Sequence, residues 1–303
     1  MAYVLWKNRF LLMLVHETGT HSTNDQKIFI EMRDNLNFLM KFGQIFMMMV
    51  AFASFLLAIV FPIANYRRKV LFVNVAFPLD KTHGTVFWIA SLYLGIGIFC
   101  ATVMTFFAVM LWYIMFNFVI DYKLLGRQLK DMGKTGLTLS TRRQDELYRE
   151  EIISAISTYD RINGNLKEFA STFSSLFFLQ IATSSLCICG MVYSSAFSTH
   201  DDLVKDGVYF IILSYSFFDI FMIMYMGNEI KLSSEGLSYC LFESNWNKQT
   251  KSNQKCVLIF EERLRKQQQI IISKIYILNL ATFRSIVNTA YSMFSLLVNL
   301  RTE

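Results

Sequence analysis

The chain has 303 residues, of which 54% are hydrophobic, 16% aromatic and only 17% charged. Soluble domains carry about 45–50% apolar and about 25% charged residues, so this excess, gathered in long uncharged blocks, predicts a membrane protein. The net charge of +6 comes from scattered basic residues and excludes a nucleic-acid partner, and the five cysteines show no zinc spacing. We therefore expect no metal and no cofactor.

The N-terminal region, residues 1–43, is mixed in character. Residues 27–40 place Ile28, Met32, Leu36 and Met40 on one helical face, which predicts a cytosolic or interfacial helix leading into the membrane. No secretory signal peptide is expected. Residues 44–64 form the first predicted transmembrane helix, because no charge interrupts them and Pro62 marks their end.

Residues 84–120 are one uncharged block that contains no proline. As a helix this block would run roughly 55 Å, well beyond the ~30 Å hydrocarbon core, yet nothing in it offers a turn. We predict one long transmembrane helix that extends into the cytosol and continues into residues 121–132. The segment 121–167 is predicted to be a cytosolic loop and helix, with the helix over 146–162.

Two further transmembrane helices are predicted at 168–197 and 207–227. The second contains Asp219, which is either a functional acid within the membrane or, as we favour, a paired or hydrated structural carboxylate. Residues 228–273 are too charged to span and are expected to form amphipathic helices outside the bilayer. Their apolar residues recur at Val257, Leu258, Phe260 and Leu264.

The last segment, 274–300, is predicted to be the fifth transmembrane helix. It carries a stripe of small polar residues at spacings of three and four: Ser285, Asn288, Ser292, Ser295 and Asn299. Leu296 and Leu300 lie beside this stripe. Lipid cannot satisfy polar side chains, so the stripe faces either an aqueous pore gated by the leucines or another helix. Spacing alone leaves both interpretations open and favours the helix contact.

The distribution of lysine and arginine predicts the orientation in the membrane. The loops 121–167 and 228–273 are rich in both, whereas the loop after the third helix holds only Lys205. Basic loops stay in the cytoplasm, so we expect a cytoplasmic N-terminal side and an extracellular C-terminus. The Arg67-Arg68-Lys69 cluster falls outside and weakens this rule without reversing it.

Three motifs carry a family resemblance. The first is Tyr159-Asp160-Arg161 with Phe173, Gln180 and Cys187. The second is Gly227-Asn228-Glu229-Ile230 with Ser233-Ser234 and Trp246, and the third is Thr282-Phe283 followed by Ile286 and Tyr291-Ser292. In this order, over residues 159–301, the chain resembles the insect odorant receptor family. The related gustatory receptors typically end in a Thr-Tyr…Gln-Phe pattern, which is absent here, so the odorant branch is favoured and the gustatory branch is the alternative.

The resemblance implies an all-α membrane protein that acts as a subunit of an odorant-gated cation channel. Family members have seven membrane helices, so the five predicted here correspond to the third to seventh. We therefore expect a shortened or partial chain, with a non-functional truncated receptor as a further alternative. The resemblance also implies a heterotetramer with a shared co-receptor subunit in the plasma membrane of olfactory sensory neurons. In such an assembly residues 228–273 anchor the subunits together.

The same resemblance implies that the polar stripe of 274–300 lines a pore. The implied pore and gate residues are Ser285, Asn288, Ser292, Leu296, Asn299 and Leu300. It further implies an apolar pocket for a small volatile ligand in the outer half of the helices. The expected wall residues are Phe55, Ile59, Trp88, Tyr93, Ile96, Tyr209 and Tyr215. For each residue taken alone, lipid contact or core packing is the alternative.

Three other classes of protein fit less well. A G-protein-coupled receptor would have the opposite orientation, and its Asp-Arg-Tyr and Asn-Pro-x-x-Tyr motifs are absent. The four histidines are scattered in termini and loops and no catalytic cluster is visible, so an enzyme is not expected. A transporter would favour Gly/Pro-broken helices in repeated halves, which the sequence lacks.

Overall fold

The computed structural model describes residues 41, 43–64, 66–67, 84–134, 141–197, 203–272 and 276–302. The predicted amphipathic helix at 27–40 and most of the loop at 65–83 lie outside these residues. The chain divides into two units, which are described separately. Unit 1 contains Ile114–Leu186 and Phe218–Ser292, and unit 2 contains the described parts of 23–113, 187–217 and 293–303.

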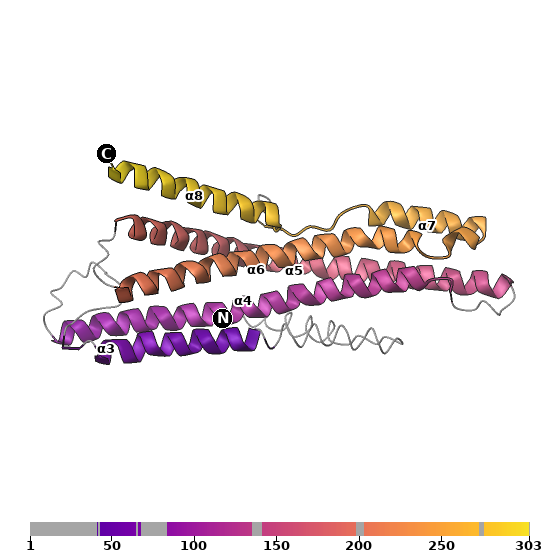
Figure 1. Ribbon diagram of the computed structural model, residues 1–303. Coiled ribbons are helices and arrows are strands. Elements are labelled where there is room, and N and C mark those ends of the chain that lie inside the picture. Colours follow the sequence, from indigo (N-terminus) through magenta and orange to yellow (C-terminus); the bar gives the residue numbers. More distant parts are fainter. Residues whose placement is uncertain are drawn as a thin grey trace. The chain divides into compact units, whose positions relative to one another are not determined.

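The described chain is almost entirely helical (Figure 1). The segment Gly43–Ala64 is helical, with a π-helical turn at Leu56–Val60 followed by α3 at Phe61–Ala64. Four longer helices follow in order: α4 Gly84–Asp131, α5 Thr141–Phe197, α6 Leu203–Phe242 and α8 Leu280–Thr302. Between α6 and α8 lie the 3-10 turn Trp246–Lys248, α7 Lys251–Leu264, and the strands β1 Ile271–Ile272 and β2 Tyr276–Ile277. The strands pair antiparallel, with Ile271 opposite Ile277.

The single long helix predicted from residue 84 is found as α4. Two predicted helix boundaries are wrong. The helix at 146–162 and the span at 168–197 are one continuous α5, and α6 runs through Gly227 to Phe242. The change to polar sequence at these points alters the surroundings without breaking the helix, because α6 keeps burying Ile230, Leu237 and Leu241 at helical spacing.

Four described helices are long and apolar enough to cross a membrane: Gly43–Ala64, Gly84–Asp131, Arg143–Tyr193 and Tyr209–Lys248. They cover the first four predicted spans. Helix α8 has 23 residues and covers residues 280–300 of the predicted fifth span, but it is not among the helices that reach that apolar level. The fifth crossing therefore stays a prediction.

Unit 1 has an aromatic core. Phe169, Phe173 and Phe177 recur every fourth residue on α5 and are all fully buried. The ring centroid of Phe169 lies 5.1 Å from that of Phe173, 5.8 Å from that of Phe177 and 5.6 Å from that of Phe118 on α4. One turn beyond Phe118, the buried Tyr122 hydroxyl donates a 2.6 Å hydrogen bond to Asn163 Oδ1. These contacts fix α4 against α5 in this unit.

Helix α7 is amphipathic, as the sequence predicts, but its apolar face is narrower. Val257, Phe260 and Leu264 are buried at spacings of three and four, whereas Leu258 is exposed. A residue next to Val257 in sequence points about 100° away around the helix, so it cannot share the buried face. Leu258 and its exposed neighbour Ile259 instead form an apolar strip on the outer side of α7.

In unit 2 the segment Gly43–Ala64 packs along the first half of α4. The hydroxyls of Ser54 and Thr102 are 2.8 Å apart. Phe46 lies between two aromatic rings, 5.8 Å from Trp112 and 6.2 Å from Tyr215 on α6. These contacts hold two helices of unit 2 side by side and leave a groove near their shared end.

Candidate functional site

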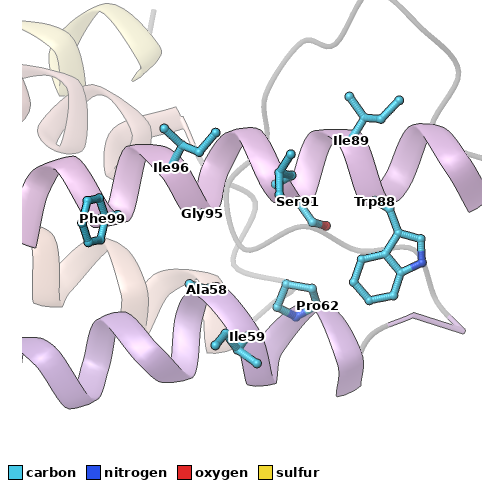
Figure 2. Close-up of a pocket in the computed structure, with 10 residues that line it drawn as sticks. Ala58, Ile59, Pro62, Trp88, Ile89, Ser91, Gly95, Ile96 and Phe99 are labelled. Atoms are coloured by element: carbon cyan, nitrogen blue, oxygen red, sulfur yellow. The ribbon is translucent and has the colours of Figure 1, made fainter.

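The groove in unit 2 has a volume of about 580 Å³ and lies between the end of segment Gly43–Ala64 and the first turns of α4 (Figure 2). Pockets of this size with mostly apolar walls are typical small-molecule sites. The lining residues are uncharged and come from two stretches of sequence. They are Ala58, Ile59, Pro62, Trp88, Ile89, Ser91, Leu92, Gly95, Ile96 and Phe99.

Helix geometry on both sides opens this groove. Trp88, Leu92, Ile96 and Phe99 are spaced by three or four residues and so share one face of α4. Between them, a Cβ atom added at Gly95 would meet nothing within 4 Å, so the missing side chain leaves open space. On the opposite wall the π-helical turn Leu56–Val60 directly precedes α3. Pro62 follows this turn and has no N–H to donate to the preceding turn.

An aromatic cluster closes one end of the groove. The ring centroid of Tyr66 is 5.7 Å from that of Trp88 and 6.1 Å from that of Phe87. Phe87 is fully buried with Ala90, whereas the Trp88 side chain is 47% exposed. The buried ring and the stacked tyrosine therefore fix the orientation of an indole that remains open to a ligand.

Ser91 is the only one of the ten lining residues that carries a hydroxyl. The residue is only 7% exposed, and its Oγ has no hydrogen-bond partner among the described residues. Figure 2 shows this oxygen on the side of α4 that faces Pro62. The groove thus contains one buried polar group whose hydrogen-bonding capacity is unused.

The structure gathers three of the seven predicted ligand residues in this groove: Ile59, Trp88 and Ile96. Phe55 and Tyr93 are exposed and lie outside its lining, and Tyr209 is half-buried elsewhere. Tyr215 packs inside unit 2, where its hydroxyl lies 2.7 Å from that of Thr105. Sequence reasoning missed Ser91, Leu92, Gly95 and Phe99, although their spacing from Trp88 was an available signal.

Helix α8 carries the predicted pore residues. Ser285, Asn288, Ser292 and Asn299 are all exposed, and the Leu296 side chain is 60% exposed. The side chain of Leu300 lies outside the part of the chain that the structure describes. The predicted pore residues whose side chains the structure describes are therefore all exposed.

The start of α8 is fixed by local hydrogen bonds. Asn279 Oδ1 caps the helix by accepting a 2.8 Å hydrogen bond from the Thr282 N–H. The Thr282 hydroxyl donates to the Ile277 carbonyl at 2.8 Å. The next residue, Phe283, meets Phe221 of α6 edge-on at 5.5 Å between ring centroids.

Gly227 permits a close approach between α6 and the linker before α8. A Cβ atom at this position would lie 2.5 Å from both the Cβ and the carbonyl oxygen of Leu278. Only a residue without a side chain fits there. We call the contact of Gly227 with Leu278, together with Thr282, Phe283 and Phe221, the linker junction. It joins the second and third sequence motifs in space.

The first motif holds the end of α7. The Tyr159 hydroxyl donates a 3.2 Å hydrogen bond to the Arg263 carbonyl and accepts one of 3.3 Å from Gln268 Nε2. Arg263 forms a 3.0 Å ion pair with Asp160. Ser234 Oγ, from the second motif, accepts the Gln268 backbone N–H at 3.4 Å. Helices α5 and α6 thereby fix the chain that leads towards α8.

Asp219 is paired, as the favoured interpretation of the sequence expects. The residue is 1% exposed, and its Oδ2 accepts hydrogen bonds from Gln180 Nε2 at 2.7 Å and Ser184 Oγ at 3.1 Å. Its Oδ1 has no partner among the described residues. The carboxylate joins α5 to α6, and Gln180 is a residue of the first motif.

Together the membrane-length helices and the linker junction define an all-α, multi-pass membrane protein. The structure of the insect olfactory receptor OR5 from Machilis hrabei in complex with eugenol has the same fold, with a TM-score of 0.82 at 18% identity. The match covers 96% of this chain and 75% of that chain. A second structure of the same receptor matches with a TM-score of 0.83 at 17% identity, covering 99% of this chain and 76% of that one.

The model of the family described as 7tm Odorant receptor matches residues 4–291, so the chain belongs to the odorant receptor family. Odorant receptor 10 of Aedes albopictus is 24% identical over 181 residues, which are 59% of this chain and 46% of that protein. Odorant receptor 83a of Drosophila melanogaster is 26% identical over 173 residues, which are 56% of this chain and 37% of that protein. The matches thus span less than half the length of these two relatives. The predicted resemblance is confirmed, and the family is one of receptors rather than enzymes.

Proposed function

We propose that this chain is a subunit of an odorant-gated, non-selective cation channel whose pore is lined by α8. The observation that carries the proposal is the exposed polar stripe of α8, with Leu296 beside it. Small polar residues on a membrane helix need protein or water as neighbours. In a ring of subunits, each stripe would face a shared aqueous pore, and the leucines would form a hydrophobic constriction that gates by dewetting.

The gating mechanism links the groove to this constriction. A volatile ligand binds in the groove and favours a state in which α8 moves outward, so that Leu296 and Leu300 withdraw and water and cations enter. The ligand shifts the equilibrium only by its difference in affinity for the open and closed states. The linker junction supports this mechanism, because it fixes the start of α8 to α6 while the rest of the stripe stays exposed.

The assembly is a heterotetramer with a co-receptor subunit in the plasma membrane of olfactory sensory neurons, with the N-terminal side in the cytoplasm. Residues 228–273 form the anchor between subunits. The exposed apolar strip of Leu258 and Ile259 on α7 supports this role, since exposed apolar surface on a helix outside the bilayer favours a protein partner.

The test is the Leu296→Ser change, expressed with a co-receptor and recorded without odorant. A hydroxyl at the constriction favours wetting, so basal current should rise several-fold relative to the unchanged chain at equal surface expression. Ala290→Ser is the matched control, because it adds the same hydroxyl on the opposite face of α8. Unchanged basal current in the Leu296→Ser channel at normal surface expression would contradict the gate assignment.

A further inference from the structure

We propose that the groove selects neutral ligands that combine an apolar body with one hydrogen-bonding oxygen, and that Ser91 binds this oxygen. The proposal rests on the receptor function proposed above and names the class of ligand. Alcohols, ketones, aldehydes and esters belong to this class, whereas plain hydrocarbons and charged molecules do not.

The first argument is the unused hydrogen-bonding capacity of Ser91. Serine and threonine within helices commonly donate to the carbonyl four residues earlier. Ser54, Thr102 and Thr105 in the same unit each do so, at 2.7 to 2.9 Å. The Ser91 hydroxyl makes no such bond although it is more than nine-tenths buried. A buried hydroxyl without a partner is costly, so a ligand oxygen that satisfies it gains affinity.

The second argument is the shape of the space next to this hydroxyl. From Ser91 the groove continues along α4 past Gly95 to Phe99, a distance of about 12 Å for eight helical residues. Apart from Ser91, the walls along this path are apolar. A ligand whose oxygen meets Ser91 therefore lays its hydrocarbon portion across the gap at Gly95, where no side chain intrudes.

The third argument is the absence of charge. None of the ten lining residues is ionisable, so an ionised ligand would enter the groove without a counter-charge. Burying an unpaired charge in apolar surroundings is strongly unfavourable. Ser91 can donate as well as accept, so carbonyl compounds and alcohols both fit, and the oxygen alone sets the preference over hydrocarbons.

The test measures direct binding, so that it does not depend on conduction. The full chain is purified in detergent, and thermal stabilisation is recorded against straight-chain alcohols, 2-ketones and n-alkanes of matched length. The unchanged chain should bind the oxygenated series more tightly than the alkanes. Ser91→Ala should weaken oxygenated ligands about three- to tenfold and leave alkane binding unchanged. Without ligand, Ser91→Ala should be at least as stable as the unchanged chain, because the hydroxyl has no partner to lose.

A second pair of variants tests the location without altering Ser91. Gly95→Leu should fill the groove and abolish binding of both series, whereas Gly97→Leu, also in open space on α4 but outside the lining, should leave binding intact. Any one of three results would overturn the proposal. These are equal affinity for alcohols and alkanes, an equal loss of affinity for both series in Ser91→Ala, and normal binding in Gly95→Leu. Selective binding without odorant-evoked current would instead contradict only the channel function.

Discussion

The linker junction makes a sharp prediction for Gly227. Replacing Gly227 with alanine places a Cβ atom 2.5 Å from the Leu278 carbonyl oxygen, whereas ordinary contacts begin at 3.4 Å. The linker backbone must therefore move by about 1 Å, or α6 must bend. Gly236 is the matched control, because it lies in the same helix and a Cβ atom there meets nothing within 4 Å.

The magnitude follows from comparing the two variants. Each glycine-to-alanine change gains about 1 kcal/mol of helix propensity, so this gain cancels in the comparison. What remains is the overlap at Leu278, and overpacking of this kind costs about 1–3 kcal/mol. Gly236→Ala should therefore raise the free energy of unfolding, while Gly227→Ala should lie about 1–3 kcal/mol below it. At roughly 2–4 °C per kcal/mol for a chain of this size, the unfolding midpoints should differ by about 2–12 °C.

Thermal unfolding of the detergent-purified chain, followed by tryptophan fluorescence, measures this difference. Hydrogen exchange at residues 276–278 gives an independent readout, since displacement of the linker should speed exchange there in Gly227→Ala but not in Gly236→Ala. Equal midpoints and equal exchange in the two variants would refute the close approach of α6 to the linker.

Two other contacts of unit 1 lead to predictions of a large and of a small loss of stability. Asp219→Leu should lower the unfolding midpoint strongly, because it leaves the buried Gln180 amide and Ser184 hydroxyl without their shared acceptor. Each donor left without an acceptor costs about 1–3 kcal/mol. Asp219→Asn keeps an acceptor oxygen and should lose less stability. An Asp219→Leu variant as stable as the unchanged chain would contradict the pairing. Arg263→Ala should cost under about 1 kcal/mol, because its ion pair with Asp160 is half-exposed, and 1 M salt should remove most of that difference. A large, salt-independent loss in Arg263→Ala would show that its side chain does more than pair with Asp160.

The sequence predicted the existence of the long helices better than their ends. An uncharged block reports the length of chain that lies in apolar surroundings, and this is why 84–120 could be assigned to one helix. The changes between polar and apolar sequence at 167 and 227 predict helix boundaries, although they mark only a change of surroundings. The α5 and α6 backbones keep their hydrogen bonds across these points and continue.

The strand pair and part of the groove could not be predicted, because their sequences show no distinctive pattern. Two-residue strands such as β1 are too short for an alternating pattern. Ser91 and Gly95 are small and neither aromatic nor charged, so nothing in the sequence marks them as wall residues beside Trp88 and Ile96. The contact between Tyr215 and Thr105 could not be predicted, because the two residues are 110 positions apart in the sequence.

The motifs that identify the family and the residues proposed to bind a ligand differ in the kind of contact they make. Each motif contributes a contact that needs a particular side chain. Gly227 has no side chain to meet Leu278, the Thr282 hydroxyl donates to the Ile277 carbonyl, and the Tyr159 hydroxyl donates to the Arg263 carbonyl. The wall residues Ile59 and Ile96 contribute dispersion alone, and apolar residues of similar volume can replace them at small cost.

It follows that the groove can change its shape, and hence its ligand, without disturbing the linker junction. The motifs therefore identify the receptor class but carry no information about the ligand. In the binding mode proposed above, that information lies in side chains such as Ser91, whose hydroxyl imposes a chemical requirement on the ligand.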